Sequence, residues 1–542
     1  MKNKFALWIS AGLGILFTST ALANKPKLIV QITIDQLRGD LLQRYESNFV
    51  ESRNKLGFNR FLKNGTLYTN SHYRHASTLT AVGHATLATG ALPSQHGLVA
   101  NNWFDVEANS RMYCVADADT SLVGAEGYSA SPANLTASTF SDQLYLASSG
   151  KAKVVSVSIK DRGAVLTGGH FGKSFWFDKK TGNMVTSTYY YDELPEWVSS
   201  FNSSGAKDQY LGQSWALSLN EDKYHNDSGN RLYQIPPKGF GKGFPHTMPK
   251  DASPRYYDLL TNTPFGDKLT MEFAKAAVTN EKLGDDDVTD YLAISFSVND
   301  YVGHKFGPNS LEAEDNLLAL DKTIAELFKF LDKKIGMENV LVALSADHGV
   351  DAIPEYKKSI GFNGFRGNAS QELEEFNSTL SEKFGVEGKL IEEVIPPNLY
   401  LNHSLIKAKN LDYGDVAKAV QSFASKLNGV SRALTSEALS TTNLQFDPVL
   451  SRVQNNYMQG RSGDIVLLQN PSTMLGNYSA ATHGSPYRYD THVPLYFTGW
   501  RVTPRREARL TSPEDLAVTL SAVMSIGYPD KATGKVLEEI VK

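Results

Sequence analysis

The sequence predicts an α/β fold, in which a mostly parallel central sheet is flanked by helices and carries inserted cap regions. Four short runs are rich in Val and Ile and stay apolar without alternation, as parallel strands covered on both faces do. A long amphipathic segment separates the last two runs, which makes a strand–helix–strand crossover. All four runs end in ionisable residues, and ligands of such sheets collect beyond the carboxyl ends of the strands. The four runs are residues 27–36, 152–163, 290–300 and 338–349.

Residues 1–23 have the features of an export signal. Two lysines, the first of them Lys2, precede an apolar run at 5–17, and Ala23 ends a small-residue cleavage pattern. The apolar run is shorter than the roughly 20 residues that a membrane-spanning helix needs, so we expect no membrane anchor. We therefore expect cleavage after Ala23 and a mature chain, residues 24–542, that is periplasmic or secreted.

The composition narrows the class of protein. The formal net charge of the 542 residues is -4, which gives no basic field for nucleic acid. Cys114 is the only cysteine, so an intramolecular disulfide is excluded. An exported chain of this kind must be stabilised by its core or by bound metal. We expect it to be a monomer.

The crossover helix is expected within residues 309–336. Its apolar positions, Leu317 and Leu320 among them, recur every three or four residues, and Asn309 or Ser310 can cap its start. Two stretches do not fit the strand–helix pattern, because they mix turn residues with isolated helical periodicity. We interpret both as cap insertions beside the sheet, at about 165–285 and about 353–480. The acidic segment at 284–290 is expected to be a solvated turn, with a structural calcium site as the alternative.

Carboxylates and imidazoles cluster at the predicted strand ends. Carboxylate oxygens and neutral imidazoles are the ligands of zinc and similar divalent ions. Each pair alone is common on surface helices and in turns, but together they can form two three-ligand sites with open positions, as catalytic sites have. Two metals about 4 Å apart can hold the attacking and leaving oxygens of a phosphoryl transfer. The candidate ligands are Asp35, Asp300, His304, Asp347, His348 and His483.

The segment 78–90, TLTAVGHATLATG, reads as the start of a helix. Thr80 can be an ordinary N-cap, or a hydroxyl placed for chemistry, because a helix start favours a phosphate through its backbone N–H groups and dipole. A threonine hydroxyl is a poor nucleophile until it loses its proton, and coordination to a dication achieves that. We favour the nucleophile, and we interpret His84 as local packing.

Residues 80–103 closely resemble the nucleophile segment of the alkaline phosphatase superfamily, which includes the nucleotide pyrophosphatase/phosphodiesterases. The shared pattern is Thr-x-x-x-His-x-x-x-x-x-Gly, followed by His-Gly and then Asn. The resemblance implies an alkaline phosphatase-like fold, Thr80 as a nucleophile that forms a phosphothreonine, and Asn101 as a phosphate contact. It also implies two Zn²⁺ ions. One set of ligands would be Asp300, His304 and His483, and the other Asp35, Asp347 and His348.

The segment 158–164 bears on the substrate. Lys160 and Arg162 alternate at the predicted strand end, so we expect both side chains to point the same way. A phosphate monoester carries one more negative charge than a diester, and an ammonium with a guanidinium would stabilise it. The segment, with the following Gly-Gly-His, resembles the phosphate-irrepressible alkaline phosphatases of the PafA/PhoK type. The resemblance implies that Lys160 and Arg162 bind phosphate and that the substrates are small-molecule phosphate monoesters.

Three alternatives stay open. The chain can be a phosphodiesterase or nucleotide pyrophosphatase that uses the same metals, or, as a weaker enzyme alternative, a phosphonate hydrolase. It can also be a non-catalytic exported protein that binds metal or phosphate.

Overall fold

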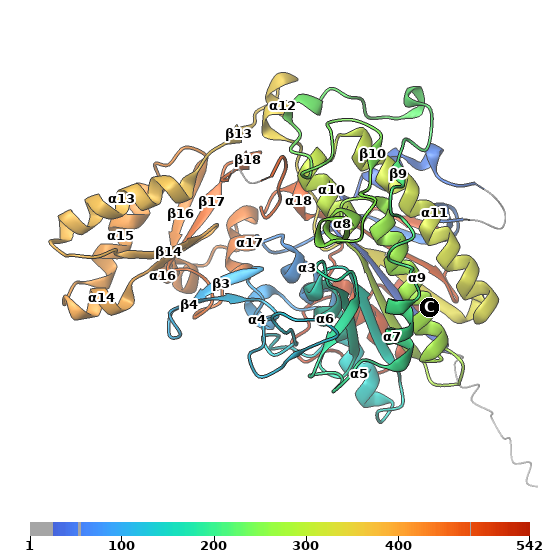
Figure 1. The fold of residues 1–542 in the computed structure, drawn as a ribbon. Coiled ribbons are helices and arrows are strands. Elements are labelled where there is room, and N and C mark those ends of the chain that lie inside the picture. The colour runs from blue at the N-terminus through green and yellow to red at the C-terminus, as the bar shows by residue number, and fades with distance from the viewer. Residues whose placement is uncertain (1–24, 52–55, 477–478, 542) are drawn as a thin grey trace, which may run out of the picture.

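A computed structural model describes residues 25–51, 56–476 and 479–541, so the expected export signal at 1–23 lies outside the described residues. A ten-stranded sheet organises the fold (Figure 1). In spatial order its strands are β20 (Arg505–Glu507), β2 (Thr66–His72), β19 (His492–Gly499), β12 (Val340–Ser345), β1 (Leu28–Ile34), β11 (Asp290–Phe296), β6 (Val154–Ser158), β7 (Lys173–Phe177), β8 (Met184–Ser187) and β5 (Leu122–Val123).

The centre of the sheet is parallel. β12, β1, β11, β6 and β7 run in one direction, and Val30 on β1 pairs with Leu292 on one side and Val342 on the other. β19 and β8 flank this block in the antiparallel direction. The four predicted strands are β1, β6, β11 and β12, four of the five strands of this block, which confirms the expected α/β class with a mostly parallel sheet.

Helices cover both faces of the sheet, as the packing of two neighbouring residues of β1 shows. Val30 packs with residues of α9 and α11, whereas its neighbour Ile29 packs with residues of α5 and α19 on the opposite face. α11 is the predicted crossover helix, and Ser310 caps its start by accepting a hydrogen bond from Ala313 N at 3.0 Å. The four helices are α9 (Pro264–Asn280), α11 (Leu311–Lys334), α5 (Phe140–Ala147) and α19 (Asp515–Met524).

The stretch at 165–285 differs from the expected cap insertion. β7 and β8 lie inside it and extend the central sheet, and α9 packs on that sheet. Its Gly- and Pro-rich middle part has little regular structure and is held by buried carboxylates of α11. Asp315 accepts hydrogen bonds from Trp215 Nε1 at 2.6 Å and Tyr224 OH at 2.5 Å, and Glu314 accepts one from Asn226 N at 2.8 Å. The turn-rich composition therefore concealed two strands and one sheet-covering helix.

The stretch at 353–480 builds a smaller lobe, at the left of Figure 1. An antiparallel sheet and three helices surround a hydrophobic core of their own, which includes Leu373, Leu399 and Val420. These elements are β14 (Ile391–Ile395), β15 (Asn398–Leu401), β17 (Ile465–Gln469), β16 (Val430–Thr435), α13 (Ala369–Phe384), α14 (His403–Ala408) and α15 (Tyr413–Ala424).

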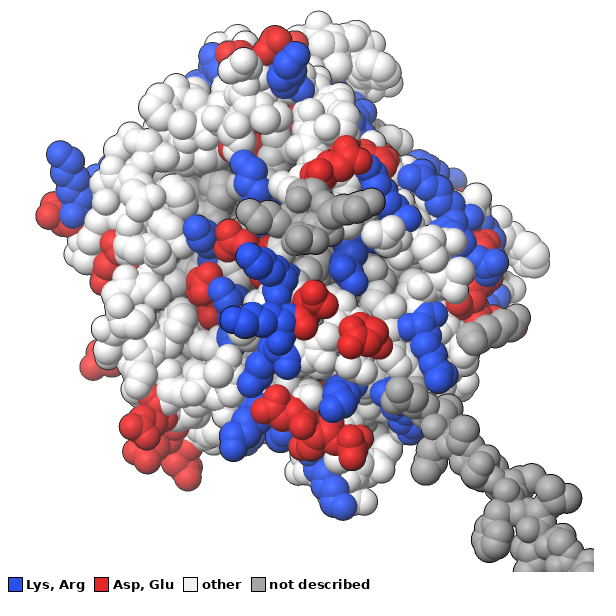
Figure 2. Space-filling model, turned by 90° about the vertical axis from the view of Figure 1, so that its right-hand side faces the viewer, with Lys and Arg blue, Asp and Glu red and all other residues white. Residues whose placement is uncertain are grey.

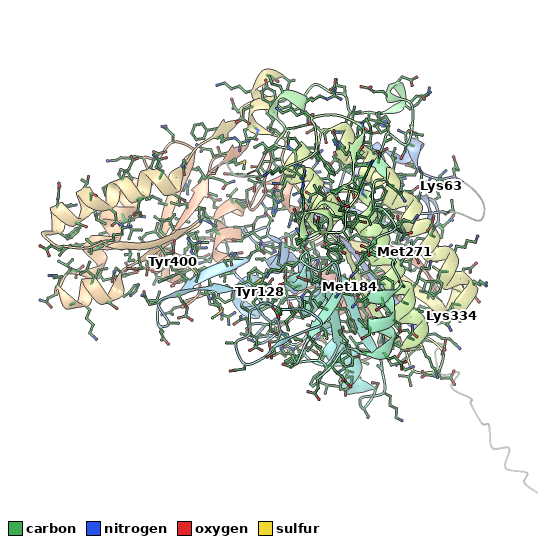
Figure 3. All side chains as sticks on the ribbon, viewed as in Figure 1. Lys63, Tyr128, Met184, Met271, Lys334 and Tyr400 are labelled. Atoms are coloured by element: carbon green, nitrogen blue, oxygen red, sulfur yellow. The ribbon has the colours of Figure 1, made fainter. Side chains whose placement is uncertain are left out.

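Apolar side chains fill the interior of the main body. Met184 on β8 and Met271 on α9, labelled in Figure 3, are buried in its hydrophobic core. Figure 2 shows acidic and basic side chains interspersed over one face of the molecule. Among the described residues, no helix combines the length and the apolar character that crossing a membrane requires.

Candidate active site

The candidate site lies where the parallel strands end. Asp35 directly follows β1, and Asp347 and His348 come shortly after β12. Asp300 and His304 lie one turn apart on α10 (Val298–Phe306), the helix that follows β11. The carboxyl ends of parallel strands meet at one edge of a sheet, so these residues converge although they are far apart in the sequence. His483 joins them from the segment that leads into β19.

One candidate metal group consists of Asp300, His304 and His483. Their ligand atoms all lie within 4.8 Å of one another. His304 Nε2 is 3.2 Å and His483 Nε2 is 3.5 Å from Asp300 Oδ1. This is the first of the two sets that the resemblance implies.

A second group gathers around His348. Its Nε2 atom lies 3.5 Å from Asp35 Oδ1 and 3.4 Å from Asp347 Oδ2. The three residues whose ligand atoms all lie within 4.8 Å of one another here are Asp35, Asp300 and His348. Asp300 therefore adjoins both groups, and Asp347 joins the second group through its contact with His348.

The chemistry of the second group fits divalent cations. Asp35 Oδ1, Asp347 Oδ2 and His348 Nε2 are buried, and among the described residues none of the three atoms has a hydrogen-bond partner. Burial lowers the pKa of His348 to about 3, which keeps the imidazole in the neutral form that binds metals. Burial and the Asp347 carboxylate raise the pKa of Asp35 well above its usual value. Negative charge is thus crowded where a cation would relieve it.

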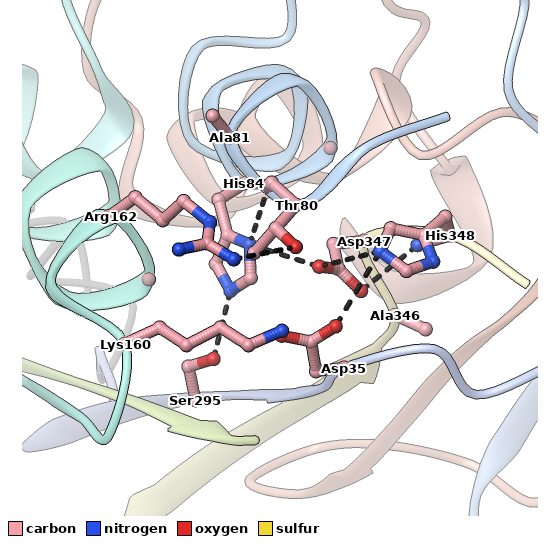
Figure 4. A network of polar contacts seen from close by, with 12 residues as sticks. Asp35, Thr80, Ala81, His84, Lys160, Arg162, Ser295, Ala346, Asp347 and His348 are labelled. Carbon is pink, nitrogen blue, oxygen red and sulfur yellow. Dashed lines mark hydrogen bonds and ion pairs between the residues drawn. The ribbon is translucent and has the colours of Figure 1, made fainter. Parts of the chain in front are cut away.

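Thr80 is the first residue of α3 (Thr80–Thr89), and Leu79, not Thr80, occupies the N-cap position. The Thr80 side chain makes no capping hydrogen bond and is 1% exposed. Arg162 Nη2 lies 3.4 Å from Thr80 Oγ1 (Figure 4). The hydroxyl therefore faces the polar centre rather than its own helix, and the plain N-cap interpretation is wrong.

Asn101 lies beside the same helix start. Its Oδ1 atom accepts a hydrogen bond from Ala81 N at 2.9 Å. Because this bond uses the carbonyl side of the amide, the NH₂ side is left as the donor for an incoming oxygen.

Lys160 and Arg162 reach the site in a different way from that expected. They do not alternate along a strand, because β6 ends at Ser158 and α6 (Asp161–Gly168) begins three residues later. Lys160 is the N-cap of α6, and Arg162 lies in its first turn. Lys160 Nζ is 2.6 Å from Asp35 Oδ2 and 2.5 Å from Asp300 Oδ2. The helix start, not strand alternation, directs both cations to the site.

Gln36 was not identified from the sequence. Its backbone has a φ of 65°, in the left-handed region. In this conformation its N–H donates to Asp347 Oδ1 at 3.0 Å, and its Nε2 donates to Asp300 Oδ1 at 2.7 Å. Gln36 thus orients carboxylates of both candidate metal groups, and its position directly after Asp35 was the only signal for it in the sequence.

His84 is buried, but it does more than fill space. Its Nδ1 lies 2.8 Å from the Thr80 carbonyl oxygen and 3.4 Å from Asp347 Oδ2, and its Nε2 lies 2.8 Å from Ser295 Oγ. The ring therefore links the start of α3 to a candidate ligand and to the end of β11. A spacing of four residues, which places Thr80 and His84 on one helix face, was a signal for this contact.

Gly83 allows α3 to pack directly against the ligand segment. A Cβ atom at this position would lie 2.0 Å from the carbonyl oxygen of Asp347. Only glycine permits this separation between α3 and the backbone of a candidate ligand.

The acidic segment at 284–290 lies apart from this site. Asp286 and Asp290 contact Lys153 at 3.2 Å and 3.7 Å, and Asp290 also accepts a hydrogen bond from Gly284 N. Among the described residues, the two candidate metal groups are those at the strand ends, and neither includes this segment.

The site combines a hydroxyl at a helix start, buried carboxylates and imidazoles at the carboxyl edge of a parallel sheet, and the cationic side chains of Lys160 and Arg162. Together these features define a metal-dependent hydrolase of the alkaline phosphatase superfamily. The model of the type I phosphodiesterase / nucleotide pyrophosphatase family matches residues 29–493, and the chain belongs to this family.

Individual relatives are similar to this chain over nearly its whole length. The chain is 36% identical over 529 residues to a Myroides odoratus protein named calcium-transporting ATPase, across 96% of this chain and 95% of that protein. It is 36% identical over 549 residues to the alkaline phosphatase PafA of Elizabethkingia meningoseptica, across 98% of each. The crystal structure of wild-type PafA matches with a TM-score of 0.87 and 35% identity, across 96% of this chain and 99% of that one.

Proposed function

We propose that this protein is an exported, metal-dependent phosphate monoester hydrolase that releases inorganic phosphate through a phosphothreonine at Thr80. One observation carries the proposal: Thr80 Oγ1 lies 3.4 Å from the Arg162 guanidinium, beside the ligand groups that Lys160 joins. The site thereby combines a nucleophile, cationic groups that can contact phosphoryl oxygens, and side chains that can bind divalent cations.

The six carboxylate and imidazole side chains would hold two divalent cations. Mixed oxygen and nitrogen donors suit zinc, which is the metal we propose. Such ions supply Lewis-acid stabilisation of the phosphoryl oxygens and lower the pKa of oxygen nucleophiles.

The residues of the chain then have separate tasks. Thr80 Oγ releases its proton to solvent and attacks phosphorus, the P–O bond to the alcohol breaks, and the alcohol leaves with a proton from solvent. Water next attacks phosphorus and releases a proton to solvent, the bond to Thr80 breaks, Thr80 Oγ takes up a proton from solvent, and inorganic phosphate is released. Asn101 donates its amide N–H to a phosphoryl oxygen, and Lys160 and Arg162 offset the negative charge of that group.

The pair of cations favours monoesters. Arg162 lies beside Thr80 with its side chain 19% exposed, and the buried Lys160 lies between Asp35 and Asp300, so the two cations match the extra charge that a monoester carries. The matching family model is that of type I phosphodiesterases, so phosphodiesterase activity is the alternative. Turnover of p-nitrophenyl phosphate above that of bis-p-nitrophenyl phosphate would support the monoesterase, and the reverse order would contradict it.

Thr80→Ala tests the nucleophile. We expect at least a roughly thousandfold loss of turnover in zinc-loaded protein, with Thr80→Ser retaining part of the activity. Acid quenching of wild type during turnover should leave phosphate covalently bound at Thr80, as mass spectrometry can detect. Full activity of Thr80→Ala would exclude Thr80 as nucleophile. Tight phosphate binding by zinc-loaded wild type without any turnover would indicate a non-catalytic binder.

The location and assembly are also part of the proposal. Residues 1–23 would direct export to the periplasm or the medium, and the mature chain would be a monomer. Cell fractionation and light scattering test these two points.

A further inference from the structure

The two sides of the Arg162 guanidinium group have different contacts. Its Nη1 donates a hydrogen bond to Tyr113 OH at 3.2 Å. On the other side of the guanidinium, Nη2 lies 3.4 Å from Thr80 Oγ1. Arg162 Nε is buried and has no hydrogen-bond partner among the described residues. The Nε–Nη2 edge therefore faces the reaction centre with donors to spare, which suits bidentate contact with a phosphoryl group.

Asp161 anchors this arrangement from behind. Its Oδ1 accepts a hydrogen bond from Tyr113 OH at 2.6 Å, and its Oδ2 accepts one from Tyr128 OH at 2.5 Å. Arg162 N also donates to Asp161 Oδ1, at 2.7 Å. Because a tyrosine hydroxyl donates its one proton and accepts through its lone pairs, Tyr113 can donate to Asp161 and accept from Arg162 at the same time. The bonds thus have a single consistent direction, from the guanidinium through Tyr113 to the carboxylate.

The two tyrosines differ in their surroundings. Tyr113 is largely buried, and burial raises the pKa of its hydroxyl well above the usual value, so the group stays protonated. Tyr128 is 63% exposed and packs edge to face on Tyr113, with ring centroids 5.7 Å apart. Figure 3 labels Tyr128 on the side of the main body toward the smaller lobe. Tyr128 is thus an exposed tyrosine whose hydroxyl is hydrogen-bonded to Asp161.

We propose that Tyr113, and more weakly Tyr128, are positioning residues that act through Asp161 and Arg162 to select phosphate monoesters. The inference rests on the proposed function, because it assumes that Arg162 contacts the phosphoryl group. Without the Tyr113 hydroxyl, Nη1 loses its acceptor and the guanidinium can turn its free edge away from Thr80. The double charge of a monoester depends on that edge more than the single charge of a diester does.

The test is a double-mutant cycle between Tyr113→Phe and Arg162→Ala. In the Arg162-containing protein, we expect Tyr113→Phe to lower kcat/KM for p-nitrophenyl phosphate about tenfold and to weaken inhibition by inorganic phosphate. Bis-p-nitrophenyl phosphate turnover should change less than about threefold. In the Arg162→Ala background, Tyr113→Phe should change monoester turnover less than about twofold, since there is no guanidinium left to position. Tyr128→Phe should follow the same pattern with a smaller effect.

Tyr210→Phe is the matched control. The Tyr210 side chain is 3% exposed, and its hydroxyl has no hydrogen-bond partner among the described residues. It should leave both activities unchanged. Equal losses from Tyr113→Phe with and without Arg162 would overturn the inference while leaving the proposed function in place. A wild type that prefers diesters, or an Arg162→Ala variant with unchanged monoester turnover, would instead overturn the proposed function.

Discussion

Lys160 Nζ lies 2.5 Å from Asp300 Oδ2, and the two side chains are 2% and 4% exposed. The same ammonium lies 2.6 Å from Asp35 Oδ2. Burial alone would lower the pKa of Lys160, but the carboxylates of Asp300 and Asp35 outweigh it and raise that pKa. Lys160 therefore remains protonated between the two candidate metal groups.

Lys160→Met should separate the two tasks of this ammonium. In metal-free protein the substitution leaves buried carboxylates without their cation, so we expect the free energy of unfolding to fall by about 3–5 kcal/mol. With zinc bound, the loss of stability should be much smaller, while monoester kcat/KM should fall about a hundredfold. Urea unfolding with and without zinc measures the first effect, and steady-state kinetics the second. Equal stability of the metal-free variant and wild type would contradict the first expectation.

Removal of metal should abolish turnover. We expect EDTA-treated protein to be inactive, and addition of two equivalents of Zn²⁺ to restore activity, because both candidate groups need divalent cations to balance their carboxylates. Metal analysis of the purified protein gives the stoichiometry directly. Full activity in protein shown to contain no metal would refute this expectation.

Gln36→Ala should weaken metal binding without removing a ligand. The substitution deletes the hydrogen bond to Asp300 Oδ1, and outer-sphere partners of this kind typically contribute ten- to a hundredfold in metal affinity. Competition with a fluorescent zinc chelator measures the change. Gln43→Ala, at a half-buried site on α1 (Leu41–Arg44), is a suitable control. Unchanged zinc affinity in Gln36→Ala would assign Gln36 a purely structural role.

Glu514 should make stability depend on pH. Burial raises the pKa of this carboxyl to about 7, from 4.5. Between those values the folded protein retains a proton that the unfolded chain has released, so the free energy of unfolding falls as pH rises from about 4.5 to about 7. Relative to Glu514→Gln, wild type should lose roughly 1–3 kcal/mol over this range. Urea unfolding at several pH values tests this, with exposed Glu326→Gln as control.

The strands were predictable because their signal is local. β1, β6, β11 and β12 are continuous apolar runs, and each run lies close in sequence to a polar residue of the site, such as Asp35 or Lys160. β7 is as long as the predicted strand β6, but β7 and β8 were missed because they lie in a stretch whose turn residues dominate its composition. β7 takes its place in the sheet by pairing with β6, and β8 by pairing with β7, and these are tertiary contacts that local pattern does not reveal.

The side chains that support the candidate ligands were less accessible to sequence reasoning. Gln36 adopts a left-handed backbone conformation that glutamine rarely takes, so only the surrounding fold selects it. Lys160 and Arg162 were placed near the phosphoryl site, but the mode was wrong, because the strand ends at Ser158, before both residues. This earlier end changes the predicted strand end into a helix start and alters the direction of the side chains there.

Gly83 leaves almost no clearance between α3 and the backbone of Asp347. A shift of the helix toward that segment is blocked by hard-sphere overlap, while retreat is resisted by the His84 bridge. The Thr80 hydroxyl and the backbone around Asp347 must consequently move together in any thermal motion of the domain. Directed evolution of new substrate preferences should therefore succeed through substitutions around Tyr128. It should fail wherever it introduces a larger residue at position 83.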